Sequence, residues 1–280
     1  MEIKIAKELG FCFGVKRAAD MTLAEVNGEV INTLGPLIHN PEFTKFLETR
    51  NAYVADTVGD IKGKKVVIRA HGIPKETEQE IQENNIEIID ATCPYVKRVQ
   101  QLAEKYYNKG YSVFILGEKD HPEVIGIESY APNSIVLKYE HDIPDLPPES
   151  KVALISQTTQ KFKTFDSLAC ALKKRFKNVA ITNTICDATE KRQKAAMKLA
   201  KEVEIMIVIG GKNSSNTTKL KEICGQIVKT HHIETEKELK KEWLKDIKTV
   251  GITAGASTPD FSIEKVVEKI KSINTPALTA

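Results

Sequence analysis

Short apolar runs alternate with longer amphipathic stretches along almost the whole chain. Runs such as 113–116, 152–155 and 205–209 are four or five residues long, as expected for buried strands of a parallel sheet. The stretches between them are typical of helices of roughly 10 to 20 residues. This alternation predicts an α/β fold in which parallel strands are joined by right-handed helical crossovers.

The chain contains an internal repeat that is centred on three cysteines. Each cysteine follows a short β-like run and opens a helix-like stretch, within 3–26, 86–107 and 179–203: Cys12, Cys93 and Cys186. A Lys-Arg pair follows each cysteine at the fourth or fifth residue: Lys16-Arg17, Lys97-Arg98 and Lys191-Arg192. Cys170 and Cys224 do not share this setting, so we expect them to be small buried apolar residues.

Two further strands follow in each copy of the repeat. The first ends in a glycine 23 to 25 residues after the cysteine, which makes three glycines equivalent: Gly35, Gly117 and Gly211. The next strand starts at a lysine and ends in small polar residues or histidine, within 65–74, 151–160 and 248–260. Three copies of three strand-helix steps account for nearly the whole chain.

We therefore predict three pseudo-symmetric α/β units with parallel sheets. They span 14–93, 94–184 and 185–272, with the strand in 1–13 completing the third unit and a tail at 273–280. Ligands of such sheets gather at the carboxyl ends of the strands. If the units form a trefoil with those ends inward, the cysteines and polar turns meet around a central cluster cavity.

Composition excludes several classes of protein. Apolar residues make up 41% and charged residues 28% of 280 residues, which is ordinary for a globular protein and not for a disordered one. The net charge of +3 is too small to indicate nucleic-acid binding. No apolar stretch approaches the roughly 18 residues of a membrane span, and residues 1–7 alternate instead of forming a signal peptide. We expect a cytoplasmic protein.

Cysteine usage points to metal binding or catalysis. The chain has five cysteines, an odd number, and we expect it to be cytoplasmic, so a disulfide framework is not indicated. At the start of a helix, backbone N–H groups and the helix dipole favour the thiolate form that binds metal. Three thiolates suit either zinc with one open position or an iron-sulfur cluster with one iron lacking a protein ligand. The spacing of the cysteines does not choose between the two.

Polar residues after the predicted strands suggest a phosphorylated ligand. Three histidines lie in these turns, His39, His71 and His121, whereas His141, His231 and His232 lie outside the repeat. The turns at 210–217 and 254–259 are rich in glycine and in hydroxyl and amide side chains, which cradle phosphate at helix N-termini. No P-loop or dinucleotide motif is present. Beside a metal-bound hydroxyl, Glu123 would be able to relay protons.

Nine motifs carry a resemblance to one enzyme family. In chain order they are GFCFGV, LGPLIHN, RAHG, DATCP, HPEV, SQTT, NTICDAT, GGKNSSNT and AGASTPD. Together they resemble the 4-hydroxy-3-methylbut-2-enyl diphosphate reductases over essentially the full chain. The resemblance implies the last step of the methylerythritol phosphate route, a two-electron removal of the allylic hydroxyl that gives isopentenyl and dimethylallyl diphosphate.

The resemblance also implies a cofactor and site residues. The family's 4Fe-4S cluster would be held by Cys12, Cys93 and Cys186 with one open iron, and would degrade readily to a 3Fe-4S form. The family's proton-relay acid falls on Glu123. Substrate-contacting positions fall on His39, His71, His121, Thr158, Ser214, Ser215, Asn216 and Ser257. A monomer that takes electrons from a ferredoxin or flavodoxin-type donor is expected.

Two rival functions are compatible with the repeat and the polar turns alone. An iron-sulfur hydro-lyase would use the same open iron to remove water without net electron transfer. A zinc-binding regulatory or phosphate-binding module would hold zinc, would be colourless and would catalyse nothing. Demand for electrons separates the first rival from a reductase, and visible absorption separates the second.

Overall fold

The computed structural model describes residues 1–26 and 28–274. The chain divides into two compact units. Unit 1 comprises Met1–Phe13, His39–Lys45 and the chain from Asp187 onward, and unit 2 comprises Gly14–Ile38 and Phe46–Cys186. The helix α2 (Pro41–Glu48) contributes residues to both units. No helix among the described residues has the length and hydropathy needed to cross a bilayer.

Unit 1 is built on one parallel sheet of order β1-β12-β10-β11. Its strands are β1 (Glu2–Ile5), β10 (Ile205–Ile209), β11 (Thr230–Ile233) and β12 (Thr249–Ala254). Its helices are α7 (Asp187–Ala200), α8 (Ser215–Gly225) and α9 (Asp260–Asn274), with short 3-10 turns at Glu236–Glu238 and Lys241–Leu244. The predicted tail at 273–280 lies, from residue 275 on, outside the described residues.

Unit 2 contains two parallel sheets. The first has the order β3-β2-β4-β5 and the second β7-β6-β8-β9. The first contains β2 (Ile31–Leu34), β3 (Ala52–Ala55), β4 (Lys65–Ile68) and β5 (Glu87–Asp90), with α1 (Phe13–Glu25), α3 (Lys75–Glu83) and a 3-10 turn at Val58–Asp60. The second contains β6 (Ser112–Leu116), β7 (Ile135–Leu137), β8 (Lys151–Ser156) and β9 (Asn178–Ile181), with α4 (Pro94–Asn108), α5 (Pro122–Glu128), α6 (Phe162–Arg175) and a 3-10 turn at Glu140–Asp142.

All three sheets have the same strand order. Numbered within each copy of the repeat, the order is second, first, third, fourth, and β1 takes the fourth place that β5 and β9 take elsewhere. The predicted α/β fold with three parallel sheets is therefore confirmed. The exact unit boundaries stay a prediction.

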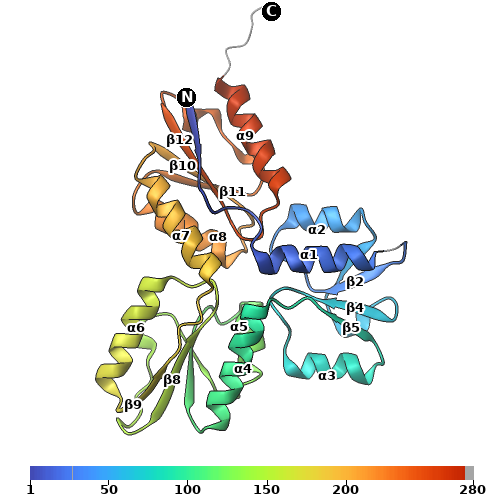
Figure 1. Cartoon of the computed structure of the whole chain (residues 1–280), viewed down its shortest axis with the longest axis vertical. Coiled ribbons are helices and arrows are strands. Elements are labelled where there is room, and N and C mark those ends of the chain that lie inside the picture. Colours follow the sequence, from blue (N-terminus) through green and yellow to red (C-terminus); the bar gives the residue numbers. More distant parts are fainter. Residues whose placement is uncertain (27, 275–280) are drawn as a thin grey trace, which may run out of the picture. The chain divides into compact units, whose positions relative to one another are not determined.

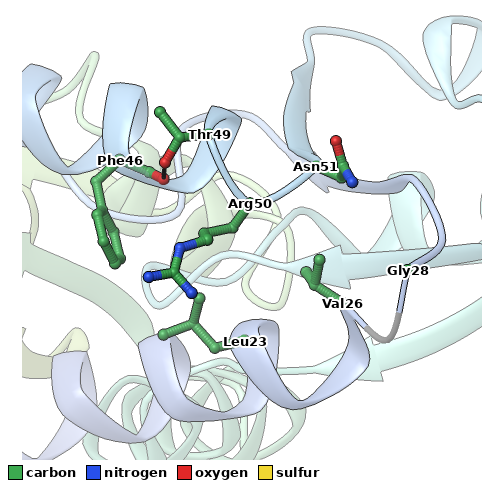
Figure 2. Close-up of a pocket in the computed structure, with 7 residues that line it drawn as sticks. All are labelled: Leu23, Val26, Gly28, Phe46, Thr49, Arg50 and Asn51. Carbon is green, nitrogen blue, oxygen red and sulfur yellow. Dashed lines mark hydrogen bonds between the residues drawn. The ribbon is translucent and has the colours of Figure 1, made fainter.

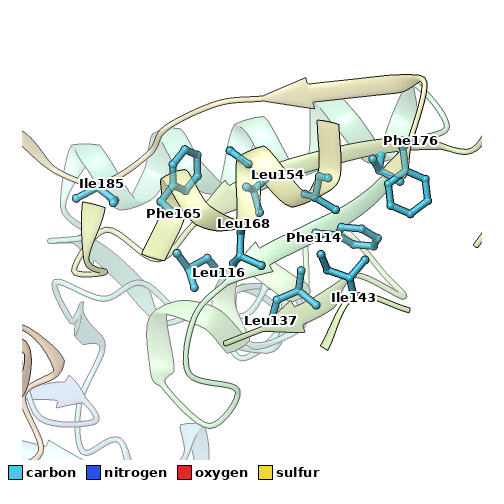
Figure 3. Close-up of a cluster of buried hydrophobic side chains, with 12 residues drawn as sticks. Phe114, Leu116, Leu137, Ile143, Leu154, Phe165, Leu168, Phe176 and Ile185 are labelled. Carbon is cyan, nitrogen blue, oxygen red and sulfur yellow. The ribbon is translucent and has the colours of Figure 1, made fainter. Parts of the chain in front are cut away.

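The sheet that contains β6 is covered on both faces, which explains why β6 is apolar from Val113 to Leu116. Along β6, Phe114 and Leu116 pack with α6, while Val113 and Ile115 pack with α4 and α5 on the other face. Figure 3 shows the first of these clusters, and Figure 1 shows α6 and α4 flanking the same sheet. Shortening a core residue such as Leu154, which is 0% exposed, to alanine would cost about 2–5 kcal/mol.

One predicted equivalence within the repeat is wrong. Gly35 and Gly117 directly follow their strands, and each donates its N–H to the last residue of the next strand, Ala55 or Leu137. In the third copy the residue with this bond is Gly210, which donates to Ile233. Gly210, and not Gly211, is therefore the equivalent glycine, because the backbone ladder ends one residue earlier than the sequence alignment suggested.

Candidate active site

The three repeated cysteines all lie where a strand gives way to a helix. Cys12 and Cys186 directly precede α1 and α7, and Cys93 is the N-cap residue of α4. All three are partly exposed. The structure therefore places each of the three thiols in the strand-to-helix setting that the repeat predicted.

The other two cysteines differ from these and from each other. Cys224 is fully buried, and burial raises the pKa of its thiol to about 11, so it is an inert core residue as expected. Cys170 is exposed on α6, so the prediction that it is buried is wrong. Its position on the helix faces solvent although its neighbours Leu168, Ala169 and Leu172 are buried.

The Cys93 turn is packed closely against α1. A Cβ added at Gly14 would lie 2.4 Å from Cys93 Sγ, so any other residue at position 14 would displace the thiol. The Cys93 N–H donates to the carbonyl of Ala70, 3.0 Å away, in the loop after β4. Glycine at position 14 therefore leaves the space that the thiol occupies.

Glu123 and Thr158 form a buried pair in unit 2. Glu123 lies in the first turn of α5 and is 2% exposed, and Thr158 follows β8 and is 6% exposed. The Thr158 N–H donates to Glu123 Oε1 at 2.6 Å, and the Thr158 hydroxyl donates to Oε2 at 2.9 Å. Burial raises the pKa of Glu123 from its ordinary 4.5 to about 7, against the opposing effect of these two hydrogen bonds. The pair therefore holds an acid that exchanges its proton near neutral pH.

Two predicted histidines lie together in unit 2. The rings of His71 and His121 are in edge-on contact, with centroids 5.6 Å apart. His121 is the N-cap residue of α5, and its Nδ1 accepts the N–H of Glu123 at 3.1 Å. Because Nδ1 accepts, a neutral His121 carries its proton on Nε2 and presents that atom as a donor. The same turn therefore places a donor and a buried acid two residues apart.

The remaining predicted residues lie in unit 1, where the turns after β10 and β12 meet the segment before α2. The Ser257 hydroxyl lies 3.3 Å from the His39 carbonyl and 3.4 Å from the Ser214 hydroxyl. Ser214 caps α8 by accepting the Thr217 N–H. A Cβ at Gly211 would lie 2.4 Å from the His39 carbonyl, so this contact requires glycine. Ser214, Ser215, Asn216 and Ser257 are all buried.

Asn216 stands out among these residues. It is 3% exposed, yet neither its amide nitrogen nor its amide oxygen has a hydrogen-bond partner among the described residues. Such a group costs roughly 1–3 kcal/mol unless it is satisfied. In the first turn of α8, where backbone N–H groups favour an anion, an oxygen-rich ligand would satisfy it.

The repeat pattern missed His232, on β11. Its Nε2 lies 2.8 Å from the carbonyl of Gly210, and because a carbonyl can only accept, the ring donates. Gly210 has φ +142°, a backbone conformation that glycine adopts readily and other residues rarely adopt. His232 therefore fixes the turn that leads to Gly211 and Ser214. No sequence signal identifies this role, since the bond joins β11 to the residue that follows the adjacent strand β10, 22 positions earlier in the chain.

A separate hollow of about 430 Å³ in unit 2 contains none of the predicted site residues. It is lined by residues of α1, of α2 and of the segments that follow them, including Leu23, Phe46 and Arg50 (Figure 2). Arg50 lies over the Phe46 ring, 5.3 Å from its centroid. The hollow is mainly apolar, and the chemistry that the repeat predicted lies elsewhere.

Comparisons with known proteins all find similarity to one family. The family model described as LytB protein matches residues 3–271. A relative from Caldanaerobacter subterraneus subsp. tengcongensis named 4-hydroxy-3-methylbut-2-enyl diphosphate reductase is 45% identical, with 98% of each chain covered. A relative of the same name from Nitratiruptor sp. is also 45% identical, and the match covers 98% of this chain and 99% of the relative.

Two solved structures are similar over nearly the whole chain. One is titled as (E)-4-hydroxy-3-methyl-but-2-enyl diphosphate reductase, the terminal enzyme of the non-mevalonate pathway; it is 42% identical, with a TM-score of 0.70 and coverage of 97% of this chain and 100% of its own. The other, the E-1-hydroxy-2-methyl-but-2-enyl-4-diphosphate reductase from Plasmodium falciparum, is 26% identical, with a TM-score of 0.90 and coverage of 99% and 89%. The chain belongs to the LytB protein family.

Proposed function

We propose that the chain is a 4-hydroxy-3-methylbut-2-enyl diphosphate reductase. The reaction adds two electrons and two protons to the substrate, breaks its allylic C–O bond and releases water, giving isopentenyl and dimethylallyl diphosphate. The observation that carries the proposal is the buried Glu123–Thr158 pair, because loss of hydroxide from carbon requires an acid that can protonate the leaving oxygen near neutral pH.

Protons would reach the substrate through Thr158. When Glu123 is protonated, its carboxyl can donate to Thr158 Oγ1, and the rotating Thr158 hydroxyl can then donate onward to the departing oxygen. The backbone N–H of Thr158, 2.6 Å from Oε1, keeps the carboxyl in place during the exchange. The Nε2–H of His121 is a further donor beside this pair.

The diphosphate would be held by the turns of unit 1. The Asn216 amide, the Ser214 and Ser257 hydroxyls and His39 supply donors, and Ser215 lies among them. Burial of the serine and asparagine side chains excludes water and so strengthens their hydrogen bonds to the anion. His71 in unit 2 is proposed as an additional donor to substrate.

The residues present fit a 4Fe-4S cluster with three protein ligands. Cys12, Cys93 and Cys186 are sulfur donors at helix N-termini, and glycine at position 14 leaves space for the Cys93 thiol. When bound, such a cluster supplies electrons and one iron that lacks a protein ligand and acts as a Lewis acid. A low-potential ferredoxin or flavodoxin-type protein is the proposed electron donor, and loss of the open iron would leave a 3Fe-4S form.

Anaerobic turnover tests the proposal. Protein reconstituted with iron and sulfide is incubated with 4-hydroxy-3-methylbut-2-enyl diphosphate, with and without a low-potential reductant, and the products are identified by mass spectrometry. We expect isopentenyl and dimethylallyl diphosphate only with reductant. Loss of water without reductant would instead support the hydro-lyase, and a colourless zinc protein without turnover would support the binding module.

A further inference from the structure

The proposed reaction assigns no role to the Lys-Arg pairs that follow the three cysteines. The three arginines of these pairs lie in different environments. Arg17 is partly buried, Arg192 is only 3% exposed and Arg98 is exposed. A buried guanidinium is costly unless it is hydrogen-bonded, so the partners of the first two arginines indicate why they are buried.

Arg17 follows Cys12 in sequence but contacts the turn that carries Cys93. Its Nη1 donates to the Thr92 carbonyl at 3.2 Å, and its Nη2 donates to the Asp90 carbonyl at 3.3 Å. No other partner of Arg17 occurs among the described residues. Gly14, which abuts Cys93 Sγ, lies three residues earlier on the same face of α1. One face of α1 therefore both admits the Cys93 thiol and fixes the backbone before it.

Arg192 shows the same arrangement in unit 1. It follows Cys186 in sequence, yet its Nη2 donates to the Gly10 carbonyl at 2.8 Å, two residues before Cys12. Its Nη1 also donates to the Ala188 carbonyl within α7, at 3.3 Å. Gly10 has φ +75°, so the backbone turns sharply where the guanidinium holds it.

Arg98 provides a natural comparison because it has no such contact. It makes no hydrogen bond or ion pair with the residues that the structure describes. The turn that carries Cys186 is held by hydroxyl and backbone groups instead. The Thr184 hydroxyl donates to the Ser156 carbonyl at 2.6 Å, and the Cys186 N–H donates to the Thr158 carbonyl at 3.0 Å.

We propose that Arg17 and Arg192 are positioning residues that hold the Cys93 and Cys12 turns in the conformation that binds the cluster. The inference rests on the proposed function, because it takes these cysteines as ligands. A guanidinium is a rigid planar fork, so its bonds to carbonyls restrict the backbone more than a lysine would. A cysteine on a restricted turn keeps its position when iron dissociates. Iron can then rebind to the thiol before it leaves the site.

The test measures cluster retention and uses Arg98 as the matched control. Arg17→Leu, Arg192→Lys and Arg98→Leu proteins are reconstituted anaerobically, and the visible absorption of the cluster is followed after a chelator is added. We expect loss to be about tenfold faster for Arg17→Leu, from the loss of two hydrogen bonds, and clearly faster for Arg192→Lys. Arg98→Leu should match the wild type.

Thermal unfolding of each apo-protein distinguishes a merely structural role of these arginines from the proposed positioning role. A merely structural arginine would lower the melting temperature without changing the rate of cluster loss at a temperature where every variant is folded. If Arg17→Leu does not fold, Arg17→Lys, which keeps the charge and can make one of the two bonds, should lose its cluster at an intermediate rate.

Failure of the inference is distinguishable from failure of the ligand assignment. Cys93→Ser protein that binds iron like the wild type would overturn the assignment itself. If Cys93→Ser loses iron while Arg17→Leu and Arg192→Lys retain their clusters as long as the wild type and Arg98→Leu, the assignment stands and the positioning role is wrong.

Discussion

Thr158 donates two hydrogen bonds to Glu123, one to each carboxyl oxygen, at 2.6 and 2.9 Å. The contact joins the first turn of α5 to the turn after β8, residues 35 positions apart in the chain. The same Thr158 accepts the Cys186 N–H through its carbonyl at 3.0 Å. Thr158 therefore connects a buried acid to the turn of a proposed cluster ligand.

Replacing the acid should separate binding from turnover. Glu123→Gln keeps the size of the side chain but cannot donate a carboxyl proton, so turnover should fall by about 10²- to 10⁴-fold. Binding of substrate should persist, since no diphosphate contact is removed. Steady-state kinetics and calorimetric binding check this. Glu128→Gln, on the same helix but without the Thr158 contact, is the control, and an equal loss in both variants would contradict a specific role.

Glu123 should also impose a pH dependence on stability. Its pKa is about 7 in the folded chain against an ordinary 4.5, so the folded state binds more protons between these values. Glu123 therefore contributes to the free energy of unfolding in full below about pH 4.5. This contribution, on the order of 3 kcal/mol, decreases as pH rises and is lost above about pH 7. Urea unfolding at pH 5 and pH 8 measures how the difference in stability between wild type and Glu123→Gln changes with pH. That change should vanish if Glu123 is ionised throughout.

Asn216 and Asn32 are both 3% exposed and make a matched pair. The Asn32 amide donates to the Tyr53 carbonyl and accepts the Lys62 N–H, whereas the Asn216 amide has no partner among the described residues. Asn32→Ala should lower stability by about 1–3 kcal/mol and leave diphosphate binding intact. Asn216→Ala should weaken binding of inorganic diphosphate without lowering the melting temperature. A stability loss in Asn216→Ala with normal binding would make Asn216 a structural residue.

His232 should influence substrate affinity without touching substrate. His232→Leu removes the donor to the Gly210 carbonyl and should raise KM about tenfold, with a smaller change in kcat. In His232→Gln, the side-chain amide can reach the same carbonyl, so KM should recover. His231→Leu is the control, because the His231 ring stacks on Trp243 instead. Equal KM in His232→Leu and the wild type would argue against this role.

Five single serine substitutions test the proposed ligand set. Cys12→Ser, Cys93→Ser and Cys186→Ser should each lose iron, because each removes a thiolate at a helix N-terminus. Cys170→Ser and Cys224→Ser should retain nearly wild-type iron, as Cys170 lies on the outer face of α6 and Cys224 is a buried core thiol. Iron per chain after anaerobic reconstitution is the measurement. Similar iron loss in all five proteins would refute the distinction that the repeat draws.

The parts that the sequence predicted are those that depend on local periodicity. Each strand-Cys-helix step was visible because a short β-like run precedes Cys12, Cys93 or Cys186 and a helical pattern follows. The contacts of Arg17 and His232 were not predictable, because each joins elements whose packing is set by the sheet and not by neighbours in sequence. The alignment error at Gly210 has the same origin, since the end of a strand is defined by its hydrogen bonds to the next strand.

The exposure of Cys170 illustrates a second limit. On α6, Leu168, Ala169 and Leu172 face the sheet, and one residue more or less along the helix turns a side chain by about 100°. The amphipathic pattern predicted the helix but not which face residue 170 would take. Burial of a single side chain therefore required the structure.

The central claim is that the chain reduces its substrate, and electron counting tests it most directly. A pre-reduced low-potential dye is mixed anaerobically with reconstituted enzyme and 4-hydroxy-3-methylbut-2-enyl diphosphate, and dye oxidation is compared with product formed. The proposed reaction predicts two electrons consumed for each molecule of isopentenyl or dimethylallyl diphosphate. Consumption of the substrate with no oxidation of the dye would contradict it.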